Sequence, residues 1–185
     1  YRAALAAWLA GPQLGDYLGC CELALLVNNA GVVSPVGPLH EQDPAAVLRS
    51  VTLNVAAPLA LAAAVTRASA AARRILHISS GAGRSAYPGW SVYCATKAAL
   101  DLHASAVALD GDDATRAVSL APGVIDTGMQ LHLRSAEAID FPDRADFVRL
   151  KNEALLTSPE DAAQRVLDYL ARPDFGAQPV ADVRQ

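Results

Sequence analysis

Short apolar runs alternate with longer helical stretches along this chain. The runs at residues 22–27, 74–78 and 117–120 are each followed closely by Asn, Ser, Gly or Pro, the residues that end strands. The run at 22–27 is predicted to be a buried strand, and a fourth run at 179–183 is a candidate last strand. Strands that alternate with helices are typical of parallel sheets covered by helices. The pattern therefore predicts one α/β domain over residues 1–185, a doubly wound parallel sheet of the Rossmann type.

The helices are predicted from their caps and from the spacing of their apolar residues. Asp43 before Pro44 and Ser158 before Pro159 each give an N-cap with proline at the first helical position. The first ten residues read as the tail of a helix that ends near Gly11. Helices are thus expected at residues 1–10, 43–71, 91–109 and 158–170, with shorter helical pieces near 146–155.

One feature of a dinucleotide-binding sheet is absent from the sequence. Such a sheet opens with a strand and a glycine-rich turn that holds the pyrophosphate. The 185 residues contain no turn of this kind, and they begin at Tyr1 within a helical pattern. We therefore expect that the sequence given lacks the N-terminal βαβ unit of the fold.

The composition indicates a globular protein with no nucleic-acid or membrane partner. The sequence is 52% hydrophobic and 18% charged, its net charge is −4, and it has no Lys/Arg run. The longest apolar stretch, 55–65, is interrupted by Pro58 and is too short to span a bilayer. No signal peptide is recognisable, so we expect a cytoplasmic protein.

The cysteines and acidic residues point to no metal site. Three cysteines, two of them adjacent at positions 20 and 21, match neither a disulfide framework nor a zinc-ligand spacing. The acidic run at 110–113 has the character of a solvated helix end. Reduced thiols and no metal are therefore expected.

Tyr93 and Lys97 stand one helical turn apart in the helix predicted at 91–109, so both lie on one face. A free phenol has a pKa of about 10, and a neighbouring ammonium group favours its anion. The pair therefore predicts a phenol of lowered pKa that serves in general acid–base chemistry. Taken alone, the same spacing also occurs between surface residues of many helices.

Polar residues follow two predicted strands at their carboxyl ends, where ligands bind in open α/β sheets. The Ser80 hydroxyl is suited to polarise a substrate carbonyl, although taken alone Ser79 and Ser80 favour a loop that caps the strand. Residues 28–31, Asn-Asn-Ala-Gly, suit the close approach of a cofactor or form a simple turn. Asn54 falls inside a predicted helix, so it is either a functional buried amide or a satisfied core asparagine.

Taken together, these residues resemble the short-chain dehydrogenase/reductase family. The family's order and spacing are met, over about residues 22–130, by Asn28-Asn29-Ala30-Gly31, Asn54, Ser80, Tyr93-x-x-x-Lys97 and Pro122-Gly123 with Thr127. The resemblance implies a reductase that moves a hydride between a nicotinamide cofactor and a carbonyl compound.

The resemblance also implies a role for each residue. Tyr93 would give its proton to the carbonyl oxygen, which Ser80 would orient and polarise. Lys97 would bind the nicotinamide ribose and lower the pKa of the phenol, and Asn54 would hold a water in a proton relay. The adenosine half of the cofactor would lie along Asn28, Ala30 and Gly31, and the nicotinamide half along Pro122, Gly123, Val124 and Thr127.

A closer resemblance is to sepiapterin reductase and bacterial benzil reductases, carried by Gly89-Trp90 and by Asp126-Thr127-x-Met129-Gln130. It implies NADP(H), with NAD(H) not excluded, and a ketone or vicinal dicarbonyl substrate. Asp182 falls where these relatives anchor a pterin, and the alternative, which its sequence context favours, is an exposed tail residue. The implied substrate-binding residues are Ser80, Trp90, Tyr93, Met129 and Asp182, and Trp90 can equally pack its loop against the sheet.

Two other functions stay open at this point. One is a 3-oxoacyl- or sugar-type reductase on the same fold, and the other is a non-catalytic binding protein. The weakly patterned segment 124–157 is expected to be a substrate lid. The family further implies a small-molecule carbonyl substrate and a homodimer or homotetramer formed through the helices at 44–71 and 91–109.

Overall fold

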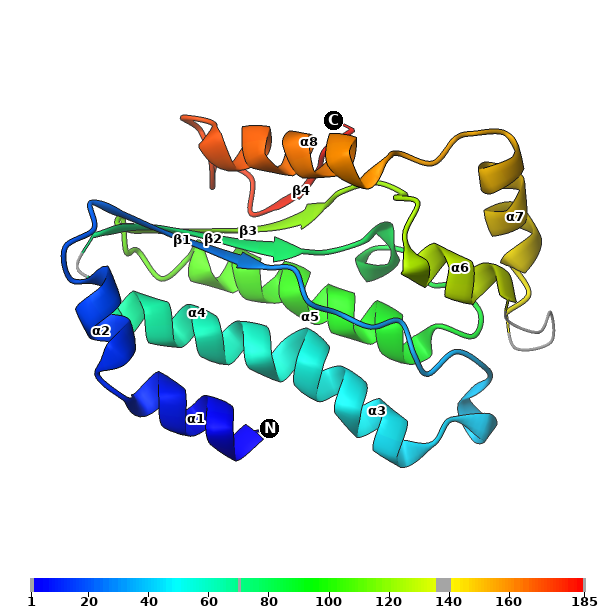
Figure 1. The fold of residues 1–185 in the computed structure, drawn as a ribbon, viewed down its shortest axis with the longest axis horizontal. Helices are drawn as coiled ribbons and strands as arrows, with labels where there is room; N and C mark the ends of the chain where they lie inside the picture. Colours follow the sequence, from blue (N-terminus) through cyan, green and yellow to red (C-terminus); the bar gives the residue numbers. More distant parts are fainter. Residues whose placement is uncertain (1, 70, 136–140, 185) are drawn as a thin grey trace.

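The computed structural model describes residues 2–69, 71–135 and 141–184. A sheet of four parallel strands, in the order β1-β2-β3-β4, forms its centre. Helices cover both faces of the sheet, so the predicted doubly wound α/β fold is confirmed (Figure 1). All four predicted strands are present, as β1 (Leu23–Asn28), β2 (Ala72–Ile78), β3 (Thr115–Ala121) and β4 (Val180–Asp182).

The helices form two layers and a cap (Figure 1). One face of the sheet carries α1 (Arg2–Ala10), α2 (Gln13–Leu18), α3 (Pro44–Val51), α4 (Ala57–Ala68) and α5 (Ser91–Val107). The other face carries α8 (Pro159–Ala171), while α6 (Gly128–Ser135) and α7 (Arg144–Asn152) lie beyond the carboxyl ends of the strands. Shorter turns are η1 (Leu39–Glu41), η2 (Thr52–Ala56) and η3 (Gly81–Gly83).

The central strands are buried on both faces, as their continuous apolar sequences predict. Ile75 on β2 packs toward α4 and α5, in a cluster with Ala62 and Ala104. The next residue, Leu76, points to the opposite face and packs with Leu170 of α8. Both strand side chains are at most 1% exposed, so the protein has one hydrophobic core on each face of the sheet.

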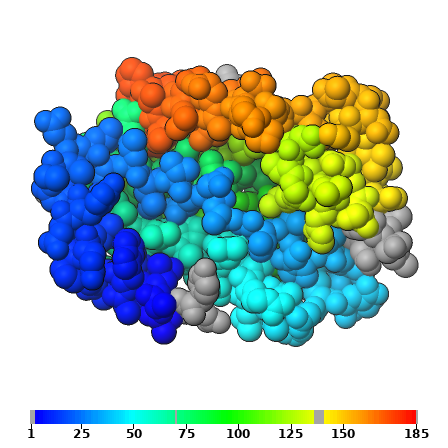
Figure 2. Space-filling model, viewed as in Figure 1, coloured from blue at the N-terminus to red at the C-terminus, as the bar shows by residue number. Residues whose placement is uncertain are grey.

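Strand β1 departs from the prediction of a buried strand. Leu23, Leu25 and Val27 are 44%, 55% and 41% exposed, while Ala24 between them is buried against α2 and α4. The strand lies at one edge of the sheet, and Figure 2 shows its residues at the surface between the helical layers. Within the described residues no helix covers that face of β1, which is compatible with a missing N-terminal unit.

The helix predicted over 43–71 runs without a break from Pro44 to Ala68, through a π-helical turn at η2. It passes Pro58, so the apolar helix is longer than the run at 55–65 suggested. It has 25 residues, and the mean hydropathy of an 18-residue window within it is 1.5, so it is the one helix of the described residues long and apolar enough to cross a membrane. This is weak evidence for a membrane span, because a helix that packs on a sheet can have the same composition.

Two helices are not predicted by the sequence. Helix α2 is short and contains Gly15, which is a poor helix former. In α6 the apolar residues Met129, Leu131 and Leu133 recur at every second position, which is the period of a strand. Helix α6 packs against α7, so its helical form goes with a tertiary contact and not with a local sequence pattern.

Phe175 supplies the first prediction, because its side chain is fully buried between α8 and the sheet, with Leu120 as a neighbour. Phe175→Ala is expected to lower the free energy of unfolding by about 3–4 kcal/mol through the cavity that it leaves. The matched control is Leu167→Ala on α8, where the side chain is 56% exposed. That change is expected to alter the free energy by less than about 0.5 kcal/mol. Urea unfolding of both variants measures the difference, and equal effects would contradict the assigned core.

Candidate active site

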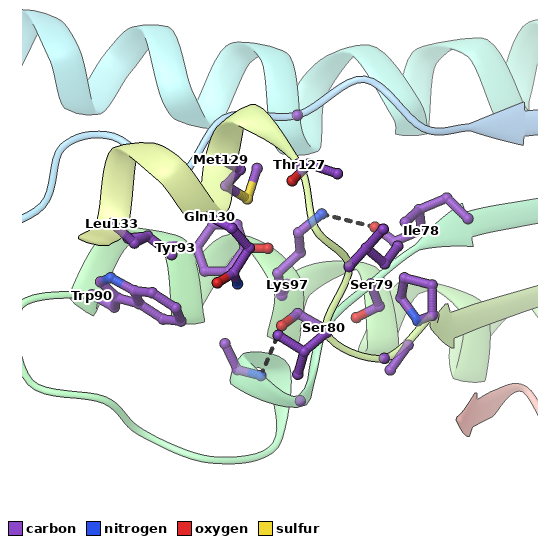
Figure 3. Close-up of a pocket in the computed structure, with 18 of the residues that line it drawn as sticks. Ile78, Ser79, Ser80, Trp90, Tyr93, Lys97, Thr127, Met129, Gln130 and Leu133 are labelled. Atoms are coloured by element: carbon purple, nitrogen blue, oxygen red, sulfur yellow. Dashed lines mark hydrogen bonds between the residues drawn. The ribbon is translucent and has the colours of Figure 1, made fainter. Parts of the chain in front are cut away.

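A cavity of about 280 Å³ lies at the carboxyl ends of β2 and β3. Its walls come from the turn after β2, the first turns of α5, the loop after β3 and helix α6 (Figure 3). Ser80, Tyr93 and Lys97 all line this cavity. The structure therefore brings together three residues that lie up to 17 positions apart in the sequence, in the place where open α/β sheets bind ligands.

Helix α5 presents Tyr93 and Lys97 to the cavity from two successive turns (Figure 3). The Lys97 ammonium nitrogen lies 5.5 Å from the centroid of the Tyr93 ring. The same nitrogen donates a hydrogen bond of 2.7 Å to the main-chain carbonyl of Ile78 at the end of β2. Because this hydrogen bond anchors the Lys97 ammonium group to the sheet, the position of Lys97 relative to Tyr93 is fixed.

Burial changes the proton affinities of both side chains. It raises the pKa of Tyr93 above 10, although the nearby Ser80 side chain lowers it in part. It lowers the pKa of Lys97 to about 8, against the opposing effect of Asp101. The lowered phenol pKa that the sequence predicted from the charge of Lys97 is wrong, because burial of the ring raises that pKa. At neutral pH the phenol is therefore a proton donor, next to a lysine that is mostly charged.

Ser80 stands directly at the cavity, where the backbone leaves β2 and enters η3. Its Oγ accepts a hydrogen bond of 3.2 Å from the Ala82 amide and so caps the short helical turn. The two interpretations of Ser80 that the sequence left open are therefore compatible. The capping bond fixes the rotamer, and the hydroxyl still faces the space beside Tyr93 (Figure 3).

Asn54 lies in the π-helical turn η2 and is 1% exposed. Its amide nitrogen donates to the Val32 carbonyl at 2.8 Å, and its amide oxygen accepts from the Val32 N–H at 2.9 Å. Both ends of the side chain thus hold the segment after β1, where Gly31 lines the cavity. A side chain on Gly31 would place its Cβ 3.4 Å from Asn54 Oδ1, so this segment packs closely on the helix.

The residues implied for cofactor binding divide into two groups. Asn28 does not line the cavity, and its side-chain amide donates a hydrogen bond of 3.1 Å to His77 Nδ1. Ala30 is exposed and also lies outside the cavity. Burial lowers the pKa of His77 to about 4, so this ring is a neutral core histidine. The loop after β3 does reach the cavity, through Pro122, Gly123, Val124 and Thr127.

The residues implied for substrate binding are also divided. Trp90 and Met129 line the cavity, and Trp90 also packs its loop, being 5% exposed. Asp182 does not line it: its carboxylate on β4 accepts hydrogen bonds from Arg184 at 2.6 Å and 2.8 Å. Arg184 itself reaches the cavity. The structure thus places an arginine, and not the predicted carboxylate, at this end of the pocket.

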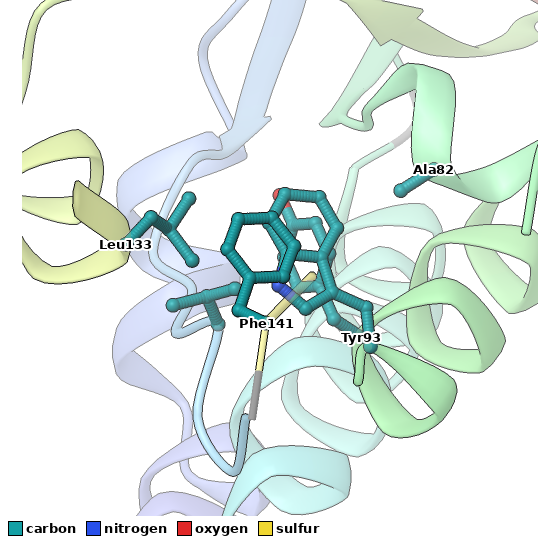
Figure 4. Close-up of a cluster of buried hydrophobic side chains, with 6 residues drawn as sticks. Ala82, Tyr93, Leu133 and Phe141 are labelled. Atoms are coloured by element: carbon teal, nitrogen blue, oxygen red, sulfur yellow. The ribbon is translucent and has the colours of Figure 1, made fainter. Parts of the chain in front are cut away.

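An aromatic cluster that the sequence did not reveal packs beside Tyr93 and contributes Trp90 and Phe147 to the wall of the cavity. The Phe141 ring, labelled in Figure 4, is stacked on the Trp90 ring, with centroids 4.9 Å apart and planes 4° apart. The Phe147 ring meets Trp90 edge-on. Trp90 in turn contacts the Tyr93 ring at 5.3 Å. Phe141 and Phe147 come from the weakly patterned segment, so no local signal marked them as neighbours of Tyr93.

The segment 124–157 leaves the sheet and returns to the same place. Its two ends meet where the Asp126 N–H donates to the Thr157 carbonyl at 3.0 Å and the Thr157 N–H donates to the Val124 carbonyl at 2.9 Å. The Lys151 ammonium of α7 pairs with the Asp126 carboxylate at 2.5 Å. Residues 136–140 of the predicted lid lie outside the described residues.

Comparisons with known proteins agree with this geometry. Residues 19–138 match the family model of short chain dehydrogenases. Benzil reductase ((S)-benzoin forming) of Bacillus cereus is 35% identical over 156 residues, which are 81% of this chain and 63% of the relative. Sepiapterin reductase of Meriones unguiculatus is 33% identical over 157 residues, 82% of this chain and 59% of the relative. The chain thus spans less than two thirds of these curated relatives.

A solved structure extends the likeness to the whole chain. A short-chain dehydrogenase/reductase from Burkholderia vietnamiensis is 49% identical and superposes with a TM-score of 0.65, over 100% of this chain and 72% of that one. The sequence match, the parallel sheet and the convergence of Ser80, Tyr93 and Lys97 on one cavity therefore agree. This chain belongs to the short-chain dehydrogenase/reductase family.

Proposed function

We propose that this protein uses NADPH to reduce a ketone or vicinal dicarbonyl to an alcohol, with Tyr93 as general acid. The observation that carries the proposal is the cavity itself. A protonated phenol, a serine hydroxyl and a buried lysine line it, and the rings of Trp90 and Phe147 form an aromatic wall beside Tyr93. Such a set can hydrogen-bond a carbonyl oxygen and protonate it as carbonyl reduction requires.

The chain's own residues would act on the carbonyl oxygen. Ser80 would donate a hydrogen bond to that oxygen and orient it toward Tyr93. As the carbonyl π electrons move to oxygen, the Tyr93 hydroxyl would transfer its proton there, which completes the alcohol and leaves a phenolate. The raised phenol pKa makes this direction of transfer favourable. Lys97, mostly charged below pH 8, would stabilise the phenolate.

The residues that line the cavity fit the nicotinamide half of the cofactor. Gly123 has φ +86°, a conformation that glycine adopts without strain, and its loop continues to Thr127 at the cavity edge. Lys97 would hold the ribose, and Gly31 allows close approach on the other side. The chemistry that bound NADPH supplies is the hydride for the carbonyl carbon. The choice of NADPH over NADH rests on the resemblance to the two reductases.

The aromatic wall supports a substrate with a flat or aryl group. Trp90, Phe147 and Tyr87 line the cavity beside Tyr93, and offset or edge-on ring contacts stabilise a bound aryl group. Benzil and sepiapterin are therefore the substrates to test first. A 3-oxoacyl- or sugar-type substrate has no aromatic group that would use this wall.

The segment 124–157 would serve as the lid of this site. The main-chain hydrogen bonds between its two ends would hold these ends in place. Its apolar side chains at the cavity are those of Met129, Leu133 and Phe147. Closure of such a segment over a substrate would exclude water from the reacting carbonyl.

The proposal includes self-association through the helical face that carries α3 and α5. Leu48 and Val51 on α3 are 60% and 41% exposed, and Leu102 on α5 is 72% exposed. A second copy of the chain would bury these side chains. Leu102→Glu is expected to reduce the molar mass measured by light scattering to that of a monomer, and an unchanged mass would contradict this face as the interface.

Tyr93→Phe tests the proposed chemistry on the full-length protein. Oxidation of NADPH with benzil or sepiapterin is expected to fall by about a thousandfold, because the phenyl ring has no proton to give. Tyr87→Phe is the matched control, since Tyr87 lines the same cavity. It is expected to keep turnover within about threefold of the wild type. No NADPH oxidation by the wild type with any carbonyl in a panel that includes 3-oxoacyl and sugar substrates would sink the proposal.

The pH dependence of the reduction tests Lys97. Its ammonium form is the useful one and dominates below the pKa of about 8, so kcat/KM is expected to be level at lower pH and to fall as pH rises through about 8. In Lys97→Arg the side chain stays charged up to about pH 12. In that variant the fall is expected at the higher pH where Tyr93 ionises. A profile that is the same in both proteins would exclude Lys97 as the titrating group.

A further inference from the structure

Asp101 lies one helical turn beyond Lys97 on α5, and it is 7% exposed. Its Oδ1 accepts hydrogen bonds from Ser79 Oγ at 2.7 Å and from Ser119 Oγ at 2.6 Å. Its Oδ2 accepts from Arg84 Nε at 3.2 Å. A buried carboxylate is stable only with such partners. These three come from the end of β2, from β3 and from the segment after η3, so one carboxylate joins three segments to α5.

Two successive turns of α5 hold two successive residues of the strand end. Lys97 binds the carbonyl of Ile78, and Asp101 binds the side chain of Ser79. The next residue in the chain is Ser80, which lines the cavity. The position of the Ser80 hydroxyl therefore depends on both contacts.

The turn after Ser80 is packed on the same part of α5. A Cβ on Gly83 of η3 would lie 2.9 Å from Asp101 Oδ2 and 3.0 Å from the Lys97 carbonyl carbon. Such distances exclude any other residue unless the backbone moves. The backbone on both sides of Ser80 is therefore held against the helix at Lys97 and Asp101.

The charges around Asp101 come from several elements. Lys97 shares its helix, and Arg84 faces it from the segment after η3, where the arginine side chain is 35% exposed. His77 on β2 is neutral because burial lowers its pKa to about 4. Asp182 on β4 is paired with Arg184. Asp101 is thus the negative group that opposes the effect of burial on Lys97.

We propose that Asp101 is a positioning residue for the reduction: it holds the strand end that carries Ser80 against α5 and keeps Lys97 in its ammonium form. The kinetic part rests on the proposed function, whereas the effect on the charge of Lys97 does not. Asp101 itself does not line the cavity, so it acts through its neighbours.

The test is a titration of Lys97 in folded, full-length protein. The 185 residues contain two lysines, Lys97 and Lys151, so ¹³Cε-lysine NMR gives signals that Lys97→Arg and Lys151→Arg assign. In Asp101→Asn the midpoint of Lys97 is expected to fall by about 1 pH unit from its wild-type value. The midpoint of Lys151 is expected to stay, and the alkaline fall of kcat/KM should move with Lys97.

Two further variants separate the charge of Asp101 from its structural contacts. Ser119→Ala removes one hydrogen bond but leaves the carboxylate charged, so the Lys97 midpoint is expected to stay where it is. Arg84→Met removes a positive neighbour of Asp101, so the midpoint is expected to rise. If the role of Asp101 were purely structural, all three variants would lose stability or activity. The Lys97 midpoint would then not move in opposite directions in Asp101→Asn and Arg84→Met. If Asp101→Asn does not fold, the rise in Arg84→Met still tests the proposal.

The outcomes distinguish this proposal from the proposed function. An unmoved Lys97 midpoint in folded Asp101→Asn overturns the role of Asp101, even if the wild type reduces benzil or sepiapterin. If the Lys97 midpoint shifts but the wild type oxidises NADPH with none of the carbonyl compounds, the control of Lys97 by Asp101 is confirmed. Only the reductase function is then contradicted.

Discussion

The hydrogen bond from Lys97 to the Ile78 carbonyl is the contact on which the site geometry depends. It joins α5 to the end of β2. Because Tyr93 is one turn earlier on the same helix, the phenol lies at the carboxyl ends of the strands. Ser80 follows two residues after Ile78, so the same bond, together with the contact between Asp101 and Ser79, holds the hydroxyl near the phenol. The contact exists because parallel strands end together at one edge, where a side chain from a covering helix can reach their last carbonyl groups.

The fold was predictable because its strongest signals are local. Continuous apolar runs marked strands buried on both faces, and the caps at Asp43 and Ser158 marked helix starts, where the structure shows both side chains accepting main-chain N–H bonds. The exposure of Leu25 was not predictable, since the sequence of an edge strand does not say which of its faces a helix covers. Helix α6 was missed for a related reason. Its apolar residues alternate like those of a strand, and only its surroundings make it helical.

The candidate site was predictable where it rests on chain order and not where it rests on burial. The positions of Ser80, Tyr93 and Lys97 at the cavity follow from strand ends and helical spacing. The placement of Asp182 did not follow, because the Arg184 side chain two residues away binds its carboxylate. Phe141 and Phe147 were missed because their contact with Trp90 is made across 51 and 57 positions of sequence, without any local pattern.

Burial of Tyr93 and Lys97 also changes how their proposed chemistry is to be understood. Desolvation favours the neutral forms of both side chains, which raises the pKa of Tyr93 and lowers that of Lys97. For a reductase the first effect is useful, because a protonated phenol is the form that donates. The second effect is harmful, since a neutral lysine cannot stabilise the phenolate that donation leaves. A carboxylate one turn away is therefore needed to keep the ammonium form, and it must be buried to act at that place. Because a buried carboxylate needs donors of its own, the serines on β2 and β3 and the arginine after η3 belong to the same electrostatic arrangement as the phenol.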